Sequence, residues 1–338
     1  MKFIGKPDSN HPNNPPKKAV LLCNLGTPDS PTPKALRRYL KEFLSDPRVV
    51  EIPPFIWNII LYGFILPFRP RRSAKMYQKI WTKQGSPLLK HSLSQKERLQ
   101  KKLQSENLDD VLVELAMCYG KPSISNAIET LEEKNVQEVI ILPLYPQYCA
   151  ATTGAIFDAM TKQFMKRRWV PKLSFINGYH QEPDFIRAIA QTITQHVQQH
   201  GQPEKFIFSY HGTPQQSLKK GDPYYHFCQQ TTRLIQEQSA LSDEQVITTF
   251  QSRFGKARWL QPYTEQTLIQ LAQKNTKHVA VICPGFSADC LETLEEIELG
   301  AKQTFISHGG ETLHYIPALN ANDEHIQFIS NLVQRELS

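Results

Sequence analysis

The chain has 338 residues, enough for one large domain or two ordinary domains, each with its own core. With 40% hydrophobic and 21% charged residues, it has the composition of a soluble globular protein. Its net charge of +7 favours an acidic partner, which could be a nucleic acid, an anionic membrane surface or a ligand with carboxylates. The aromatic and basic residues do not form a nucleic-acid recognition module, so we expect no nucleic-acid partner.

The N-terminal segment, residues 1–17, is rich in Pro, Asn and Lys and predicts a disordered lead-in. It lacks the apolar stretch of a signal peptide, so we expect a cytoplasmic protein. Six cysteines are scattered without a C-x-x-C pair, and several fall in apolar runs. They predict neither a disulfide framework nor a zinc site. None follows Cys290, so we expect no cluster held by the C-terminal tail.

The most apolar window, residues 53–68, is followed at once by the basic run R-P-R-R at 69–72. The window is shorter than the ~20 residues that a membrane span needs. Two interpretations remain, a buried helix or an exposed lip of aromatic and aliphatic side chains. A lip with basic neighbours would suit a membrane surface or a flat apolar ligand with acidic tails.

Short apolar runs rich in β-branched residues alternate with helical patterns along the chain. Helical periodicity is found, for example, at 35–44, 124–134 and 185–197. Such alternation is typical of α/β proteins in which helices cover both faces of parallel sheets. The runs predict eight strands, which divide into two four-stranded halves: residues 19–25, 111–117, 137–143, 172–177, 205–210, 245–251, 278–284 and 312–317.

Two pairs of similar segments indicate a duplicated core. L-G-T-P at 25–28 matches H-G-T-P at 211–214, and the run K-N-V-Q-E-V-I-I-L-P ending at Pro143 resembles K-N-T-K-H-V-A-V-I-C-P ending at Pro284. The offsets are 186 and 141 residues, so the first half holds an insertion of about 45 residues between these landmarks. The window at 53–68 lies in this insertion, which we interpret as a functional addition.

His211 follows the apolar run at 205–210, at the position that Leu25 holds in the first copy. A lone histidine there is more often a structural residue than a ligand. In open parallel sheets, however, ligands bind beyond the carboxyl ends of the strands. An imidazole with an ordinary pKa of ~6.5 could accept protons from such a ligand at neutral pH.

An acidic segment follows Pro284. Read as a helix, it places Asp289, Glu292 and Glu296 at i, i+3 and i+7, which stacks three carboxylates on one face. The alternative interpretation is a solvated acidic face. If His211 faces these groups, one nitrogen donor and hard oxygen donors would suit a divalent first-row metal without holding it tightly.

Several segments together resemble the signatures of the ferrochelatase family, and the match runs from about residue 18 to residue 325. The resemblance implies two Rossmann-like, chelatase-type domains, each a four-stranded parallel sheet flanked by helices, with a porphyrin in the cleft between them and a hydrophobic lip at its mouth. The segments are Y-P-Q-Y at 145, S-Y-H-G-T-P at 209, K-G-D-P-Y at 220, Q-S-R-F-G-x-x-x-W-L-x-P-Y-T at 251–264 and F-S-A-D-C-L-E-T-L-E-E-I at 286–297.

We expect the N-terminal domain to span residues 18–170 and to include the lip insertion at about 46–90. The C-terminal domain is expected at 171–325, and residues 326–338 are expected to form the end of a C-terminal helix.

The resemblance assigns roles to individual residues. It implies that His211 and Glu292 are the catalytic pair and the metal ligands; which of them binds metal first and which takes the protons is left open. Glu296 and Glu298 would continue an acidic path for iron or protons along a distorted helix. The porphyrin-contacting positions match Leu25, Tyr77, Ser86 and Arg72, with Arg71 as the alternative arginine.

The implied activity is insertion of Fe²⁺ into protoporphyrin IX to give protohaem with release of two protons, the last step of haem biosynthesis. Iron and porphyrin would be substrates, and neither a tightly bound cofactor nor an iron–sulfur cluster is expected. The alternatives are a chelatase for another metal or tetrapyrrole, such as cobalt or coproporphyrin, and a non-enzymatic haem or porphyrin carrier. Further expected partners are the inner membrane surface, reached through the lip at 53–68, and transiently the preceding enzyme of the pathway.

Two cysteines depart from the family pattern. Cys118 stands where many relatives have an arginine, which puts in doubt any metal-binding role of that position. Cys290 stands where other members have a histidine two residues before the glutamate, so an outer metal site that uses this histidine is not expected here.

Overall fold

The computed structural model describes residues 3–4, 17–255 and 257–337. The predicted disordered lead-in at 1–17 therefore lies almost wholly outside the described residues. The chain forms two compact units: an N-terminal unit of residues 1–144, 150–178 and 326–338, and a C-terminal unit of residues 145–149 and 179–325. The domain limits expected at 18–170 and 171–325 stay predictions.

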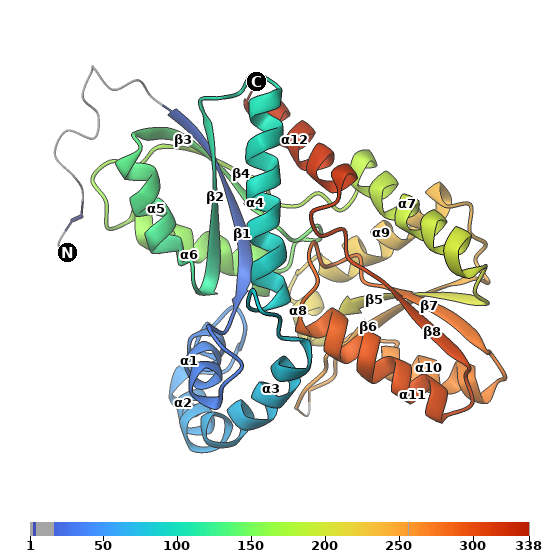
Figure 1. Ribbon diagram of the computed structural model, residues 1–338. Helices are drawn as coiled ribbons and strands as arrows, with labels where there is room; N and C mark the ends of the chain where they lie inside the picture. The colour runs from blue at the N-terminus through green and yellow to red at the C-terminus, as the bar shows by residue number, and fades with distance from the viewer. Residues whose placement is uncertain (1–2, 5–16, 256, 338) are drawn as a thin grey trace. The chain divides into compact units, whose positions relative to one another are not determined.

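The N-terminal unit is built on a four-stranded parallel sheet with the order β2-β1-β3-β4. Its strands are β1 (Lys17–Thr27), β2 (Val111–Gly120), β3 (Val136–Pro143) and β4 (Lys172–Phe175). The helix α4 (Pro87–Ser105) covers one face, and α5 (Ile124–Glu133) and α6 (Ala155–Phe164) cover the other (Figure 1). A short π-helix, η2 (Ala150–Gly154), leads into α6. The central strand β1 is buried on both faces, as its unbroken apolar run predicts.

The C-terminal unit repeats this arrangement with the strand order β6-β5-β7-β8, again all parallel. Its helices lie in two layers, α7 with α9 and α10 with η3 and α11. The expectation of two four-stranded parallel sheets flanked by helices is confirmed. The elements are α7 (Pro183–His200), β5 (Lys205–His211), α8 (Gln215–Lys219), α9 (Tyr224–Gln238), β6 (Val246–Gln251), α10 (Thr264–Gln273), β7 (His278–Ile282), the π-helix η3 (Glu292–Ala301), α11 (Lys302–Ser307), β8 (Thr312–Ile316) and α12 (Asp323–Leu337), most of which belongs to the N-terminal unit.

The two glycines of the repeated G-T-P turns have the same packing role. A Cβ on Gly26 would lie 1.8 Å from the backbone oxygen of Tyr119 in β2, and a Cβ on Gly212 would lie 2.9 Å from the backbone oxygen of Gln251 in β6. Only glycine lets the end of the central strand approach its neighbour this closely. The duplication predicted from the short motifs therefore has a structural counterpart.

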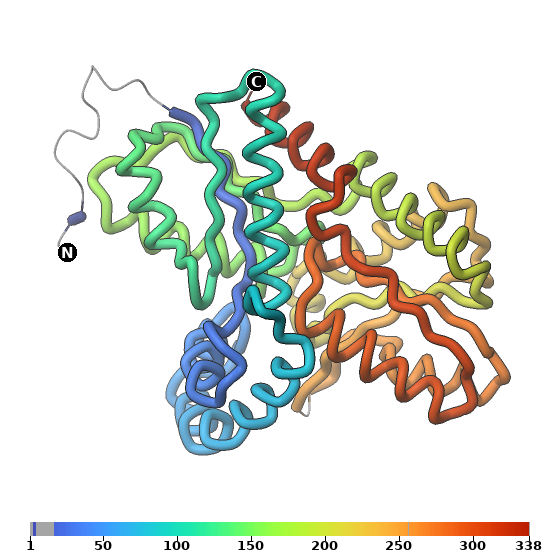
Figure 2. The backbone as a smooth tube through the Cα atoms, in the orientation of Figure 1, coloured from blue at the N-terminus to red at the C-terminus, as the bar shows by residue number. Residues whose placement is uncertain are grey.

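A helical group of the N-terminal unit, which contains most of the lip insertion expected at about 46–90, lies beyond the carboxyl end of β1 (Figure 2). It consists of α1 (Pro33–Leu44), α2 (Pro54–Ile60), the π-helix η1 (Leu61–Ile65) and α3 (Leu66–Ile80). Trp57, Leu61 and Leu66 pack on Leu40 and Leu44 of α1. This buried face anchors the segment to its own unit.

The other face of the same segment is exposed. Phe55, Phe64 and Phe68 keep 79%, 66% and 72% of their surface accessible. Large exposed apolar groups are costly in water unless something else covers them, so the lip is the better of the two interpretations of residues 53–68. Among the described residues, no helix is long and apolar enough to cross a membrane.

Candidate active site

His211 is the last residue of β5, and its side chain is half-buried. Its Nδ1 lies 2.7 Å from the backbone oxygen of Gly212. Because a carbonyl oxygen can only accept, Nδ1 carries the hydrogen and the neutral ring keeps its lone pair on Nε2. The backbone therefore prepares Nε2 to accept a proton or to bind a metal.

Gln251, the last residue of β6, pairs with His211 in the strand register. Its buried side chain accepts a hydrogen bond from Ser209 at 2.6 Å. Its amide donates to the backbone oxygen of Glu292 at 2.7 Å and reaches a carboxylate oxygen of Glu296 at 3.5 Å. A single side chain thus joins the strand beside His211 to the first turn of η3.

Ser252 follows Gln251 with a φ of 65°, in the left-handed region that non-glycine residues avoid. Its hydroxyl donates to the same carboxylate oxygen of Glu296. Such a conformation costs on the order of 1 kcal/mol and persists only where the surroundings enforce it. The strained backbone of Ser252 therefore keeps its hydroxyl in place as a hydrogen-bond donor to the carboxyl group of Glu296.

The side chain of Glu296 is half-buried, and the pKa of its carboxyl group is raised to about 7. Burial is the main cause, the charge of Glu292 adds to it, and the hydrogen bonds from Ser252 and Gln251 oppose it. Near neutral pH this group is close to half protonated. It can take up or release a proton with little cost, as a proton relay requires.

Glu292 opens η3, a π-helix in which backbone hydrogen bonds join residues five apart. The structure brings Glu292 and Glu296 close enough for their charges to interact. Glu298 is exposed and stands two positions after Glu296, a spacing at which helical side chains do not face each other. The structure therefore does not place Glu298 beside Glu296, and its role in an acidic path stays a prediction.

Asp289 lies before the helix begins, and its side chain is buried. Its carboxylate accepts hydrogen bonds from Tyr315 at 2.6 Å, Asn320 at 2.7 Å and Thr293 at 2.9 Å. The prediction of three carboxylates stacked at α-helical spacing is wrong, because this segment is not an α-helix and Asp289 is tied to the loop after β8.

The residues predicted to contact porphyrin lie in the N-terminal unit. Leu25 is half-buried near the end of β1, and Tyr77 is buried on α3. Ser86 is buried and caps α4 by accepting a backbone N–H at 3.2 Å. Arg71 and Arg72 are exposed on α3. Their contacts with a porphyrin stay predictions.

Sequence reasoning gave no role to Gln251 and Ser252, although both lie in a motif that it singled out. The strand order could have identified Gln251. Once β6 is placed next to β5, the last residue of β6 must lie beside His211. A polar residue at that point can hydrogen-bond to the segment that follows β7.

The two cysteines that depart from the family pattern are neutral thiols. Burial raises the pKa of Cys118 to about 12. Burial and the nearby Glu292 raise the pKa of the Cys290 thiol. Both positions therefore carry neutral thiols at neutral pH in the metal-free protein.

Two repeated parallel sheets, with a metal-competent imidazole and titratable carboxylates at a strand end, define a chelatase-type α/β protein. SirB from Bacillus subtilis with Fe³⁺ has a similar fold, with a TM-score of 0.54 and 11% identity over 94% of this chain and 95% of that one. CbiX, described as the terminal enzyme for biosynthesis of sirohaem in denitrifying bacteria, has a TM-score of 0.53 and 12% identity over 95% of this chain and 100% of that one.

The chain belongs to the ferrochelatase family, whose sequence profile matches residues 17–337. It is 52% identical to ferrochelatase 2 of Shewanella oneidensis over 94% of this chain and 97% of that protein. It is 50% identical to the ferrochelatase of Idiomarina loihiensis over 100% of this chain and 92% of that protein. Members of this family are lyases of haem synthesis, so the resemblance seen in the motifs is confirmed.

Proposed function

We propose that this chain inserts Fe²⁺ into protoporphyrin IX to give protohaem, releasing two protons, as the last step of haem biosynthesis. The observation that carries the proposal is the connection of His211, through the end of β6, to Glu292 and Glu296 of η3. The chain is identical to known ferrochelatases at about half of all positions, and this relationship supports the same reaction.

The reaction exchanges two pyrrole N–H bonds for bonds from nitrogen to iron. A flat porphyrin keeps its nitrogen lone pairs in the ring plane, so a site complementary to a puckered ring would stabilise the geometry in which the metal enters. In this proposal Nε2 of His211 accepts at least one of the two protons. Glu292 binds the metal or relays a proton.

Glu296 would carry protons away from this centre. Its pKa of about 7 lets it receive a proton and release it to water without a large barrier in either direction. The negative charge of Glu292 raises the pKa of Glu296. A cation bound to Glu292 would offset this charge and lower the pKa of Glu296. Metal arrival would thus promote proton release.

In this proposal the porphyrin is bound by the positions that match the family's porphyrin contacts, Leu25, Tyr77, Ser86 and Arg72. Leu25 would offer an apolar surface to the macrocycle, and the exposed guanidinium of Arg72 would pair with a propionate. We further propose that the lip formed by residues 53–68 rests on the cytoplasmic face of the inner membrane. Its exposed phenylalanines and the neighbouring arginines match an apolar surface with anionic headgroups.

The direct test uses the purified full chain with protoporphyrin IX and Fe²⁺ under anaerobic conditions, followed by the change in porphyrin absorbance. We expect protohaem to form, and we expect slower turnover with coproporphyrin or with Co²⁺. His211→Ala should abolish insertion while the quenching of porphyrin fluorescence still shows binding. His308→Ala, which changes an exposed histidine at the end of α11, is the matched control and should retain activity.

Full turnover by His211→Ala would overturn the assignment of this residue. A chain that binds protohaem tightly but inserts no metal would be a carrier. Faster insertion into coproporphyrin would move the proposal to that substrate.

A further inference from the structure

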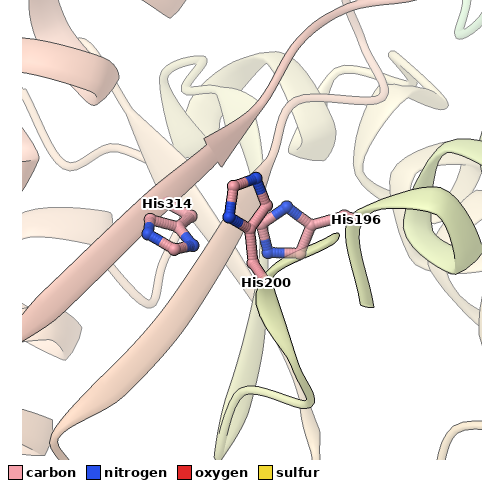
Figure 3. Close-up of side chains that lie close together, drawn as sticks. All are labelled: His196, His200 and His314. Carbon is pink, nitrogen blue, oxygen red and sulfur yellow. The ribbon is translucent and has the colours of Figure 1, made fainter. Parts of the chain in front are cut away.

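Three histidines of the C-terminal unit converge at a place that the proposed reaction does not use. His196 and His200 come from the last turn of α7, and His314 comes from the middle of β8. Figure 3 shows the three imidazoles grouped together, and one ring nitrogen of each lies within 4.8 Å of the others. The ring centroids are 4.5 to 5.4 Å apart.

The sequence explains this convergence. Residues four apart on an α-helix share one face, so His196 and His200 point the same way. The helix α7 packs against β8, the edge strand of the sheet. Side chains alternate across a strand, and His314 is on the side that meets α7.

The cluster is separate from His211. In the sheet register, His314 pairs with Ala280 of β7, and Ala280 pairs with Phe206 of β5. His211 stands five residues after Phe206, a distance of about 16 Å along the strand. The two sites therefore cannot share one ion.

The three rings have no hydrogen-bond partner among the residues that the structure describes. His196 is 8% exposed, His314 is half-buried and His200 is exposed. Burial lowers the pKa of His196 to about 4, and the two other histidines of the cluster add to this effect. Burial also lowers the pKa of His314, as do His200, Lys302 and His278. At neutral pH the buried ring therefore presents a lone pair rather than a charge, which is the form that binds metals.

The cluster is reachable from solvent. His196 and His200 line a hollow together with Thr192 of α7 and the segment at 315–322 that follows β8. An ion could enter there and keep water in a remaining position.

We propose that His196, His200 and His314 form a second metal site, for a divalent first-row cation that prefers imidazole ligands, with Zn²⁺ as the representative ion. Three imidazoles and one water complete the tetrahedral set that Zn²⁺ favours. Zn–N bonds of about 2.0–2.1 Å would place the nitrogens roughly 3.4 Å apart. In the structure these nitrogens lie within 4.8 Å of one another, so a small rotation of the side chains would bring them to this distance.

The site would hold metal that is not inserted into porphyrin. Lys302, whose charge reaches His314, opposes a cation and limits its affinity. Iron is a poorer match, because affinity for such nitrogen sites rises from Fe²⁺ towards Cu²⁺ and Zn²⁺.

The test measures Zn²⁺ binding by isothermal titration calorimetry in the absence of porphyrin. The protein is the full chain without an affinity tag, freed of metal by a chelator, in a His211→Ala/Glu292→Gln background that removes the proposed insertion site. We expect one equivalent of Zn²⁺ to bind. His200→Ala and His314→Ala, each added to this background, should weaken Zn²⁺ binding at least 10- to 100-fold. A loss of this size follows even when only a residue that hydrogen-bonds to a metal ligand is removed.

The matched control is His308→Ala in the same background, which should bind as the background does. Co²⁺ supplies a spectroscopic check, because a four-coordinate ion has visible bands that should vanish in His200→Ala. His200→Ala in the otherwise unchanged chain should insert iron at the normal rate, so failure of this site is distinguishable from failure of the proposed function. A background protein that binds no Zn²⁺, or cluster variants that bind as tightly as His308→Ala does, would overturn the proposal.

Discussion

The side-chain amide of Gln251 donates to the backbone oxygen of Glu292 at 2.7 Å. Gln251 is fixed beside His211 by strand pairing, and Glu292 begins η3. The position of this π-helix at the end of the sheet is therefore set by a polar contact as well as by the apolar packing of Ile297 and Ala301. The same side chain reaches Glu296, so it connects the elements that carry all three proposed reaction groups.

The first prediction concerns this connection. Gln251→Leu keeps the approximate volume but removes the donor to the carbonyl of Glu292 and the acceptor for Ser209, which keeps only its contact with Thr264. We expect a loss of about 1–3 kcal/mol in the free energy of unfolding. We expect kcat for iron insertion to fall about 10- to 100-fold, because small displacements of reacting groups are costly, while KM for porphyrin changes little.

Gln245→Leu is the matched control, because Gln245 immediately precedes β6 and its side chain bonds only to Ser242 among the described residues. It should leave kcat unchanged. Equal kcat values for the two variants would show that the Gln251 contact does not position the site.

The sequence predicted the architecture well for a physical reason. Each of the eight expected strands is found among the described residues within a few residues of its expected limits. The inner strands are apolar runs because a parallel sheet covered by helices buries both of their faces, whereas the edge strand β4 is partly exposed. The form of η3 could not be predicted in this way. The apolar spacing of Leu294 and Ile297 fits an α-helix, and only the tertiary contacts of Asp289 and Gln251 reveal where the helix starts.

The second prediction concerns the titration of Glu296. Its pKa in the folded protein, about 7, lies above the ordinary value of 4.5, so the folded chain holds a proton that the unfolded chain has released between these pH values. The stability that this proton contributes is fully present below pH 4.5 and is lost as the pH rises through 7. Glu296→Gln should flatten this part of the stability profile, by on the order of 3 kcal/mol.

The measurement compares urea unfolding of the two proteins at several pH values across this window. Glu298→Gln is the control, because the exposed Glu298 side chain has no comparable burial. Parallel profiles for the unchanged chain and Glu296→Gln would show that Glu296 titrates normally.

The third prediction separates a structural carboxylate from a reactive one. Asp289→Asn replaces an oxygen that accepts hydrogen bonds with a donor, in a buried place surrounded by donors. We expect it to lower the free energy of unfolding by about 1–3 kcal/mol. Glu292→Gln should leave stability nearly unchanged and abolish iron insertion.

Thermal unfolding and initial rates of porphyrin metallation, measured on both variants, decide this point. The helical spacing alone placed the two carboxylates on one face, and only the resemblance to ferrochelatases singled out Glu292. Retained activity in Glu292→Gln would remove this residue from the proposed mechanism.

The candidate site shows the same division between what the sequence predicts and what it misses. His211 was found because it interrupts a repeated turn in which the first copy has Leu25. Ser252 was not assigned, because its importance lies in a left-handed backbone conformation that its residue type does not reveal. The three histidines at 196, 200 and 314 were also missed, because the third comes from a strand more than a hundred residues later.

The fourth prediction concerns the turn that carries His211. Gly212→Ala would bring a methyl group within 2.9 Å of the backbone oxygen of Gln251 and 3.2 Å of the Trp259 ring. The strand ends must separate to admit it, which should cost about 1–3 kcal/mol of stability and reduce insertion activity. Gly63→Ala is the comparison, because no atom outside its own stretch of helix lies within 4 Å of the added methyl group. Equal unfolding midpoints for the two variants would contradict the close-approach argument.

The fifth prediction concerns the lip. Replacing Phe55, Phe64 and Phe68 together by Ser removes exposed apolar surface without opening the buried cluster around Trp57. Each exposed change should alter the free energy of unfolding by no more than about 0.5 kcal/mol. Binding to anionic phospholipid vesicles should fall strongly, because burial of these rings supplies the apolar part of the attraction. Sedimentation with vesicles measures the bound fraction.

The basic side chains beside the lip should act through electrostatic attraction to anionic headgroups rather than through apolar burial. Arg71→Gln/Arg72→Gln should weaken binding to anionic vesicles by about 1 kcal/mol per charge and leave binding to neutral vesicles unchanged, and added salt should mimic this effect. Ile306→Ser is the control, because Ile306 is an exposed apolar residue on α11, outside the lip. If Ile306→Ser lowers vesicle binding as much as the triple phenylalanine variant does, the attraction is general to exposed apolar groups and the lip is not the contact surface.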